Sequence, residues 1–567
     1  MRTIRRLHNT SFVDHLQCAD FKIGTEKRPN LKWLVRLDGL VRVPIFDPSD
    51  SYSGYVVVYV EKRRSYEVVA FQKENGRILW KSNLINGGYG APALRGNELL
   101  LLSGFTDLEA LDKKTGQSLW KFKTNGRIRS PINIIDNLAI VSNAGNIYAI
   151  GENGGLVFQI MSPRTFFFGL CAKNANGDFL TLGTQQGEGN KEARIYLYSF
   201  KENINWKVDL GPGNLTSSDT SGVQISNDIA YIASSERVWA IDSAGTVLWS
   251  THSCGIGMRS LCIVSYESIF LTTVEGFVQC FDKKTGAQLW TTFLSDAGVW
   301  MPVSVFADAL FVSAGGFLWM LHAKDGVIKS KMPIGQSPYS ACSISEGNLF
   351  VGAGDPPYFG FLLSFEMISV DCPIASAKII GHIKQEPKAD EPVELIVFVQ
   401  NAEPTKIKSI SLDLSQIGDS ASMPPYLSDS DKNEYRFLSD PSLGRRCGVY
   451  ALPLTICYKD DKRQIIMLEL EFTSRREIMD EIILNNIEMT PQENLNYSGA
   501  SCIQALRRIY GEELEQSEIR DMANNVLKKS GYQAFDTWRS VARRLLLSEA
   551  KRTRDLPEFK ISKEGDA

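Results

Sequence analysis

The chain has 567 residues, of which 43% are hydrophobic. This length exceeds what one hydrophobic core can support, so we expect two to four folding units. The 62 Lys and Arg residues nearly balance the 65 Asp and Glu residues, which argues against a charge field that would draw the whole molecule to nucleic acid or to an acidic membrane surface.

Residues 1–29 are predicted to be an N-terminal extension. Their basic start, MRTIRRLHNT, is followed by SFVDHLQC, which lacks the apolar core of a secretory signal. Cys18 has the place of a lipoprotein acceptor cysteine, but Asp14 and His15 interrupt the apolar stretch that such a signal needs. No run of 18 consecutive apolar residues occurs. The sequence therefore predicts a cytoplasmic protein without a membrane span.

One phrase recurs along the next part of the chain. Residues 110–120 read ALDKKTGQSLW and residues 280–290 read CFDKKTGAQLW. Looser copies begin at residues 70, 149, 198, 240 and 321, and most copies end 38 to 43 residues after the one before. In most copies an apolar strand is followed by a turn containing Gly and then by a new strand, which is the pattern of a hairpin. A period near 40 residues is typical of one four-stranded propeller blade.

Eight inner strand sets can be counted, with ends near residues 71, 112, 150, 200, 241, 281, 321 and 365, but only seven outer strands follow them. Residues 31–37, LKWLVRL, match an outer strand, and we expect them to pair beside the last set and close the ring. The sequence thus predicts a multi-domain, mainly β protein whose residues 30–370 form an eight-bladed β-propeller, with seven blades as the alternative.

Two kinds of residue are predicted to hold this propeller together. The aromatic residue that closes an outer strand is expected to dock between neighbouring blades. The Asp and Gly of each copy are expected to form the hairpin turn rather than a pair of catalytic carboxylates. The docking residues are Trp33, Trp80, Trp120, Phe158, Trp206, Trp249 and Trp290, and the turn residues are Asp112, Gly116, Asp242, Gly245, Asp282 and Gly286.

The repeated phrase resembles the tryptophan-docking motif of the pyrroloquinoline-quinone-like β-propeller superfamily, a WD40-like architecture. That superfamily includes quinoprotein alcohol dehydrogenases as well as non-enzymatic scaffolds similar to the outer-membrane assembly lipoprotein. The dehydrogenases hold their quinone against a disulfide of neighbouring cysteines and bind calcium, whereas the ten cysteines here include no neighbouring pair and no calcium ligands can be transferred. The resemblance therefore implies the fold and leaves quinone- and calcium-dependent dehydrogenase activity as an alternative function.

No catalytic, cofactor-binding or metal-binding residue is predicted. The cysteines form no CxxC pair, which favours reduced, buried thiols. The five histidines show no metal-ligand spacing. The run GIGMRS at residues 255–260 opens no predicted helix, so we do not interpret it as a phosphate-binding loop.

Two further regions follow the propeller. Residues 371–474 contain short alternating strands and are predicted to form an immunoglobulin-like β-sandwich. Residues 475–567 show helical spacing and are predicted to be an α-helical C-terminal region. Within them, Gln492 and residues 497–511 are similar to the start of papain-like double-glycine leader peptidases, but Ser498 stands at the nucleophile position and no histidine follows His382.

The sequence as a whole predicts a non-catalytic protein-protein interaction scaffold without a cofactor, within a bacterial multi-protein system. Its partners are expected to be other proteins, bound through a propeller face or the C-terminal helices, and nucleic acid is not expected. The alternatives are the quinoprotein dehydrogenase and a pseudo-peptidase that binds a peptide or a subunit through residues 490–556.

Overall fold

The computed structural model describes residues 9–10, 17–18 and most of residues 27–472. The gaps in the last range are 61–64, 85–91, 129, 186–192, 202, 213–221, 235–236, 254–262, 266, 274–275, 296–298, 300, 336–340, 355–359, 370–375, 380–393, 418–421, 430–432 and 440–447. The chain divides into two compact units, Met1–Phe472 and Thr473–Ala567. The predicted C-terminal helices and Ser498 therefore lie outside the described residues.

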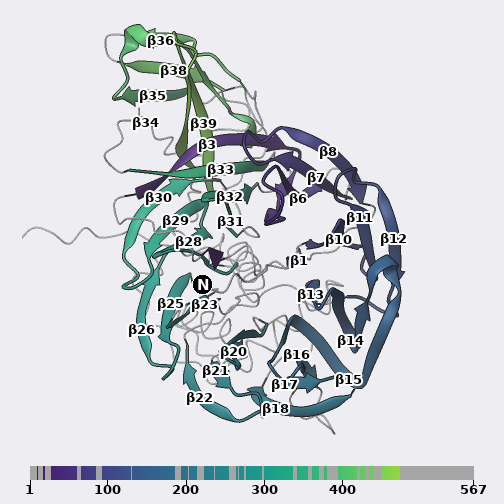
Figure 1. The fold of residues 1–567 in the computed structure, drawn as a ribbon. Helices are drawn as coiled ribbons and strands as arrows, with labels where there is room; N and C mark the ends of the chain where they lie inside the picture. The colour runs from purple at the N-terminus through teal and green to yellow at the C-terminus, as the bar shows by residue number, and fades with distance from the viewer. Residues whose placement is uncertain are drawn as a thin grey trace, which may run out of the picture. The chain divides into compact units, whose positions relative to one another are not determined.

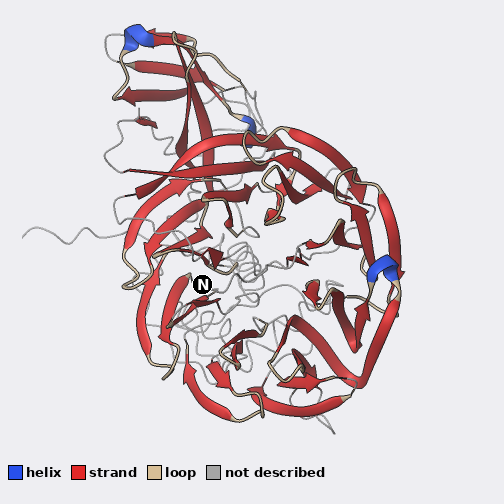
Figure 2. Cartoon of the chain, viewed as in Figure 1, coloured by secondary structure: helices blue, strands red, loops and turns tan. Residues whose placement is uncertain are grey.

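Within the first unit the described structure is mainly β, with three short 3₁₀ helices (Figure 2). These helices are η3 (Glu152–Gly154), η4 (Pro404–Lys406) and η5 (Ser415–Ile417). None of the helices in the described part is long and apolar enough to cross a bilayer.

Successive antiparallel sheets are arranged around a ring (Figure 1). The first contains β4 (Leu40–Val41), β6 (Ser53–Val60), β7 (Ser65–Gln72) and β8 (Ile78–Leu84), with β5 (Ile45–Phe46) paired to β6. The second contains β9 (Ala93–Arg95), β10 (Glu98–Ser103), β11 (Asp107–Asp112) and β12 (Ser118–Lys123). The next contains β13 (Asn133–Ile135), β14 (Leu138–Ile150), β15 (Leu156–Lys173), β16 (Phe179–Gln185), β17 (Arg194–Phe200) and β18 (Ile204–Pro212).

The remaining sheets of the ring repeat the four-stranded pattern. One contains β19 (Gln224–Ser226), β20 (Ile229–Ser234), β21 (Arg237–Ile241) and β22 (Val247–His252), and the next contains β23 (Ile263–Ser265), β24 (Ser268–Thr272), β25 (Phe277–Asp282) and β26 (Gln288–Phe293). Another contains β27 (Ser304–Phe306), β28 (Ala309–Ala314), β29 (Phe317–His322) and β30 (Ile328–Pro333). The last contains β31 (Ser343–Ser345), β32 (Asn348–Ala353) and β33 (Gly360–Ser369), completed by β3 (Lys27–Leu37).

Burial along each set follows the position of the strand in its sheet. The middle residues of β11 are all buried, whereas β12 alternates between exposed and half-buried residues. An inner strand packs on both faces and reads as a continuous apolar run, while an outer strand has one face in solvent and alternates. This difference explains why the inner runs are apolar and the outer strands carry Lys and Thr.

The N-terminal part of the chain supplies the outer strand of the last sheet. β3 pairs antiparallel with β33, and Trp33 lies opposite Ser364. This is the pairing that the LKWLVRL run predicts. Further toward the N-terminus, β1 (Asn9–Thr10) pairs with β9, and β2 (Gln17–Cys18) pairs in parallel with β27. The innermost strands of two sheets therefore each have an N-terminal segment along their edge.

The third and fourth strand sets differ from the prediction of separate blades, because they share one six-stranded sheet. β15 pairs with β14 through residues 156–161 and with β16 through residues 165–173. The chain between these segments stays extended apart from a bend at Arg164, whose φ is 70°, and Phe166 still pairs with Ala144 of β14. Hydrogen bonding consequently continues from one set into the next.

Residues 376–472 form two sheets that share one core. The first contains β34 (Ser376–Ile379), β35 (Glu394–Gln400), β38 (Glu434–Leu438) and β37 (Leu427–Asp429), and the second contains β36 (Ile407–Leu412), β39 (Gly448–Tyr458) and β40 (Arg463–Phe472). Apolar residues of both sheets, such as Val397 and Leu454, belong to one buried cluster. The alternation of buried and exposed residues along β35 is that of a sheet with one face in this core.

The two-sheet region is packed directly on the ring. Ala451 of β39 and Met467 of β40 are buried in the same apolar cluster as Leu318 of β29. Gln416 accepts a hydrogen bond from the backbone amide of Ala451 at 2.8 Å, and its side chain lies so close to Gly335 that a Cβ there would be 2.4 Å from it. The ring and the two-sheet region thus share apolar and polar contacts.

We expect Gly116→Ala to destabilise the protein more than Gly96→Ala. Both glycines have a positive φ, but a Cβ at Gly116 would lie 2.5 Å from the Trp80 ring while a Cβ at Gly96 meets nothing within 4 Å. Backbone strain costs each variant about 1 kcal/mol, and overpacking adds about 1–3 kcal/mol only at Gly116. Urea unfolding of both variants measures the difference, and equal midpoints would contradict this packing.

Candidate functional site: the docking positions between repeats

The predicted docking tryptophans lie against the turn of the next repeat. A Cβ added to Gly116 would approach the Trp80 ring to 2.5 Å, and one added to Gly286 would approach the Trp249 ring to 2.4 Å. Such distances require the absence of a side chain, so the turn glycine and the indole form one packing unit. The same contact joins Trp33 to Gly76, Trp120 to Gly154, Trp206 to Gly245 and Trp290 to Gly326.

The indole N–H groups add a polar link to this contact. Trp33 Nε1 donates to the carbonyl of Lys73 at 3.0 Å, Trp80 Nε1 to the carbonyl of Lys113 at 3.2 Å, and Trp290 Nε1 to the carbonyl of Ala323 at 3.1 Å. Each acceptor lies at the equivalent place in the following turn. The docking residue therefore both fills the space above a glycine and satisfies a backbone carbonyl of the next repeat.

Two docking positions depart from this pattern. Phe158 has no N–H to donate, and its ring centroid lies 5.9 Å from that of Phe179 of β16. Trp120 donates to the carboxylate of Glu98 at 2.6 Å instead of to a backbone carbonyl. Glu98 in turn pairs with Arg95 at 2.6 Å. The docking position in β12 therefore uses a carboxylate where Trp33, Trp80 and Trp290 use a backbone carbonyl.

The predicted turn aspartates organise their own hairpins. Asp112 Oδ1 accepts the backbone N–H of Thr115 at 2.8 Å, and Asp282 Oδ1 accepts that of Thr285 at 2.7 Å. Asp242 Oδ1 accepts the backbone N–H of Thr246 at 2.7 Å. The three carboxylates are thus engaged in three separate hairpin turns, between β11 and β12, β21 and β22, and β25 and β26.

Hydrogen bonding also sets the ionisation of these carboxyl groups. For Asp282, the hydroxyl and backbone N–H of Thr285 hold the pKa below its ordinary value. For Asp112, burial alone would raise the pKa, but the bonds from Thr115 and Asn97 outweigh it, and the net pKa is lowered. A carboxylate that accepts several N–H bonds is stabilised in its charged form, so both side chains act as turn acceptors.

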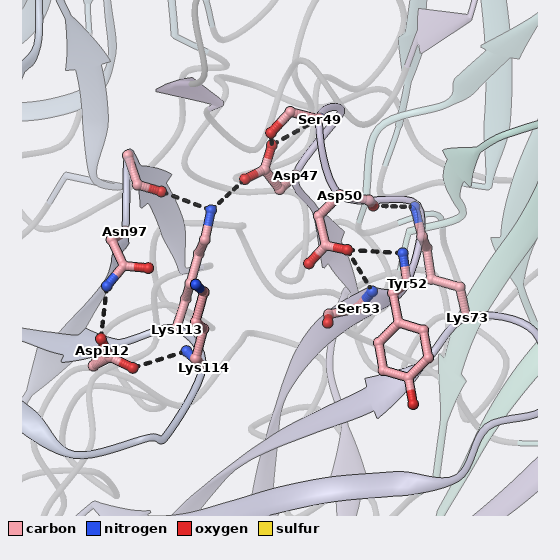
Figure 3. A network of polar contacts seen from close by, with 11 residues as sticks. Asp47, Ser49, Asp50, Tyr52, Ser53, Lys73, Asn97, Asp112, Lys113 and Lys114 are labelled. Carbon is pink, nitrogen blue, oxygen red and sulfur yellow. Dashed lines mark hydrogen bonds and ion pairs between the residues drawn. The ribbon is translucent and has the colours of Figure 1, made fainter.

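A set of lysines that sequence reasoning missed connects neighbouring repeats (Figure 3). Lys113 Nζ lies 2.6 Å from Asp47 Oδ2 of the preceding repeat and donates to the carbonyl of Gly96 at 2.8 Å. The Asp47 side chain is fully buried, and Ser49 donates to it from its backbone N–H at 2.8 Å and its hydroxyl at 2.6 Å. Burial alone would raise the pKa of Asp47, but the bonds from Lys113 and Ser49 outweigh it and lower the pKa.

The same repeat position recurs elsewhere around the ring. Lys73 Nζ bonds to the carbonyl of Asp50 at 2.6 Å and to the carboxylate of Glu346 at 3.1 Å, which joins the first sheet to the last. Lys283 Nζ reaches the hydroxyl of Ser226 at 3.4 Å. Lys73, Lys113 and Lys283 each stand two residues after the last apolar residue of an inner strand. That shared spacing is the sequence signal from which the lysine links could have been predicted.

Arg95, rather than a lysine, connects the second strand set to the third. Its guanidinium donates to the carbonyls of Ile150 at 2.8 Å and Gly151 at 3.0 Å, and it lies 5.6 Å from the centre of the Trp120 ring. The side chain is almost fully buried, at 1% exposure. A buried guanidinium needs several acceptors, and here Glu98 and the two carbonyls supply them.

Three of the described cysteines, Cys171, Cys280 and Cys342, are buried thiols, and Cys457 is half-buried. Burial raises the pKa of Cys171 and of Cys280 to about 11, and raises that of Cys342 further. A thiol with a raised pKa is a poor nucleophile and a poor metal ligand at neutral pH. In the part of the chain that the structure describes, His, Cys, Asp and Glu side chains form no group that could hold a metal ion.

We expect the Asp47–Lys113 pair to make stability depend on pH. Because the folded-state pKa of Asp47 is lowered, its contribution is present above the unfolded-state pKa and is lost as pH falls through the folded one. Asp47→Asn should cost about 3 kcal/mol at pH 7 and much less at pH 3, as measured by urea unfolding. The control is Lys284→Ala, which breaks an exposed pair with Glu267 and should leave the urea midpoint almost unchanged. Equal losses for Asp47→Asn at both pH values would contradict the assignment.

The ring region of this chain is similar to known proteins. The sequence model of the family described as outer membrane protein assembly factor BamB matches residues 54–161 and 191–353. Tetrathionate hydrolase of Acidithiobacillus ferrooxidans is 21% identical over 290 residues, which are 46% of this chain and 54% of that protein. The chain therefore spans about half the length of this curated relative.

Two solved structures are also similar to this chain, at low sequence identity. BamB of Moraxella catarrhalis is 18% identical with a TM-score of 0.45, over 60% of this chain and 98% of that one. A europium-containing methanol dehydrogenase is 12% identical with a TM-score of 0.49, over 64% of this chain and 97% of that one. The recurring phrase and the family match together confirm the predicted resemblance of the ring region to the pyrroloquinoline-quinone-like β-propeller repeat superfamily.

Proposed function

We propose that this protein is a non-catalytic interaction scaffold, built on an eight-bladed propeller followed by an immunoglobulin-like sandwich, that works in the cytoplasm as part of a bacterial multi-protein system. In the eight-bladed interpretation, the shared six-stranded sheet counts as two blades, and β3 is the outer strand of the last blade. The immunoglobulin-like interpretation follows from the two facing sheets of residues 376–472.

The observation that carries the proposal is a repeated exposed apolar position. The residue directly before the docking ring is about half exposed at Leu119, Val157, Leu248 and Leu289, with exposed fractions of 50%, 58%, 49% and 54%. These side chains lie on the outer strands β12, β15, β22 and β26. Large apolar side chains that gather at exposed positions mark interaction surfaces more often than scattered ones do, and the repeat places these at equivalent points of the outer rim.

Two further observations support a binding role. The docking contacts and the lysine links tie several neighbouring repeats together, and such preorganisation lowers the cost of association. The three turn aspartates and the thiols of Cys171, Cys280 and Cys342 are also occupied by structural roles, since the carboxylates accept turn N–H groups and these thiols are buried. These groups are thereby committed to the fold.

The proposal is tested with partners recovered from the native host. Quantitative cross-linking mass spectrometry measures how much of a stoichiometric protein partner is recovered with full-length protein. The double variant Leu248→Ser and Leu289→Ser should recover at least ten-fold less of that partner, because it lacks two half-exposed apolar side chains. The matched control is Leu438→Ser, since Leu438 is 46% exposed on β38 outside the rim. Its partner recovery should stay within two-fold.

Three results would count against the proposal. A purified protein that binds pyrroloquinoline quinone with calcium and recovers no partner would favour the dehydrogenase. Release of sulfur products from tetrathionate by the purified protein would favour a hydrolase. Recovery of the protein outside the cytoplasmic fraction of its host would contradict the proposed location.

A further inference from the structure

At one end of the strand sets formed by β9–β12 and β13–β15, side chains from four segments come together. The hairpin between β10 and β11 carries Phe105, which is 49% exposed. The chain after β12 carries Arg127, whose guanidinium lies 4.5 Å from the centre of the Phe105 ring. The two segments are also joined by a backbone bond from Ile128 N to Phe105 O at 2.7 Å. An exposed aromatic ring is thus stacked against a cation at this end.

The neighbouring strand set adds Met161 and Arg164. Met161 ends the outer segment of β15 and is 73% exposed. Arg164 is exposed in the bend that follows. In the same bend, the carbonyl of Ser162 would lie 3.7 Å from a Cβ atom added to Gly145. This bend therefore lies against the turn at residues 144–145 of β14, and it presents its side chains at the same end as that turn.

An amide cluster, in which Asn143 and Asn146 are buried, connects the two sets at this end. Asn143 Nδ2 donates to Asn125 Oδ1 at 3.0 Å, and Asn146 Nδ2 donates to Asn143 Oδ1 at 3.2 Å. Gln159 Nε2 donates to Asn146 Oδ1 at 2.7 Å, and Tyr148 donates its hydroxyl to Asn125. A satisfied polar network of this kind is rigid. It therefore fixes the spacing between the loop that carries Arg127 and the first segment of β15, which includes Met161.

The charge at this end is predominantly positive. Lys123 and Arg164 form no ion pair with any residue in the described ranges, and Arg127 adds a third cation. The acidic groups of the same strands are Glu109, which pairs with Lys121 at 3.2 Å, and Asp107, which accepts a bond from Thr106 at 2.9 Å. Arg127 thus contacts the exposed Phe105 ring, Lys123 ends the adjoining strand β12, and Arg164 follows Met161 in β15.

We propose that Phe105, Lys123, Arg127, Met161 and Arg164 form a docking surface for an acidic peptide segment that carries apolar side chains. The cations complement carboxylates of such a segment, and Phe105 and Met161 offer apolar contacts. Aromatic residues, Met and Arg are the types enriched at protein interfaces. Nucleic acid fits less well, because its binding depends on many phosphate contacts, whereas only three cations gather here and the chain carries a formal net charge of −3.

The inference deepens the scaffold proposal and rests on it. The test uses full-length protein on an array of 12-residue peptides in four classes: acidic with Leu and Phe, acidic alone, neutral with Leu and Phe, and basic with Leu and Phe. The first class should retain at least ten-fold more protein than each of the other three. A labelled oligouridine of 20 nucleotides is the nucleic-acid probe, and we expect it to bind at least ten-fold more weakly than the first class.

Charge reversal locates the binding on this surface. Arg127→Glu with Arg164→Glu should lower retention on the first class at least ten-fold, and Arg127→Lys with Arg164→Lys should restore most of it. The matched control reverses two exposed lysines on other outer strands, Lys32 of β3 and Lys329 of β30, and should change retention less than two-fold. Thermal unfolding of each variant verifies that it is folded.

The outcomes separate this inference from the scaffold proposal. Equal retention of all peptide classes, retention that the Arg127→Glu and Arg164→Glu variant keeps, or preferential oligouridine binding each overturns the docking surface. If native partners are still recovered in that case, the scaffold proposal stands without it. Quinone binding in place of partners overturns the scaffold proposal itself.

Discussion

The contact between a docking tryptophan and the turn glycine of the next repeat is the interaction on which the ring depends. A Cβ at Gly286 would approach the Trp249 ring to 2.4 Å, so each indole fits only where the following turn lacks a side chain. Because every such contact joins one repeat to its successor, these contacts work with the β3–β33 pairing to make a closed ring from local strand pairing. The same contact occurs where the ring closes, because Trp33 of the N-terminal strand β3 docks on Gly76.

A second, polar layer connects the same repeats. Lys73, Lys113 and Arg95 each reach a carboxylate or carbonyl groups of an adjacent repeat from a nearly buried position. A buried cation is costly unless its partners are fixed, and the docking contacts fix them. The two layers therefore depend on each other: the apolar contact sets the spacing, and the ion pairs are favourable only at that spacing. This coupling gives the outer rim a constant shape for binding.

The repeat period and the closing phrase were sufficient to predict the strand order, the turn role of Asp112 and the pairing of residues 31–37. They were not sufficient for the shared six-stranded sheet, because the backbone bend at Arg164 depends on contacts with β14 rather than on a local motif. The lysine links were also missed, although Lys113 and Lys283 hold the same place in the two best copies. A charged residue in a turn reads as solvent-exposed from sequence, and only the neighbouring repeat shows that it is buried.

Hydrogen exchange of full-length Trp33→Ala tests the central claim that the docking contacts hold the repeats together. The matched control is Trp319→Ala, because Trp319 Nε1 donates within its own sheet, to the carbonyl of Ala314 at 3.0 Å. We predict that Trp33→Ala lowers protection on both sides of the ring closure, in β7 and β8 as well as in β32 and β33, whereas Trp319→Ala affects β28 and β29 alone. Loss of protection confined to β3 in the Trp33 variant would contradict the account.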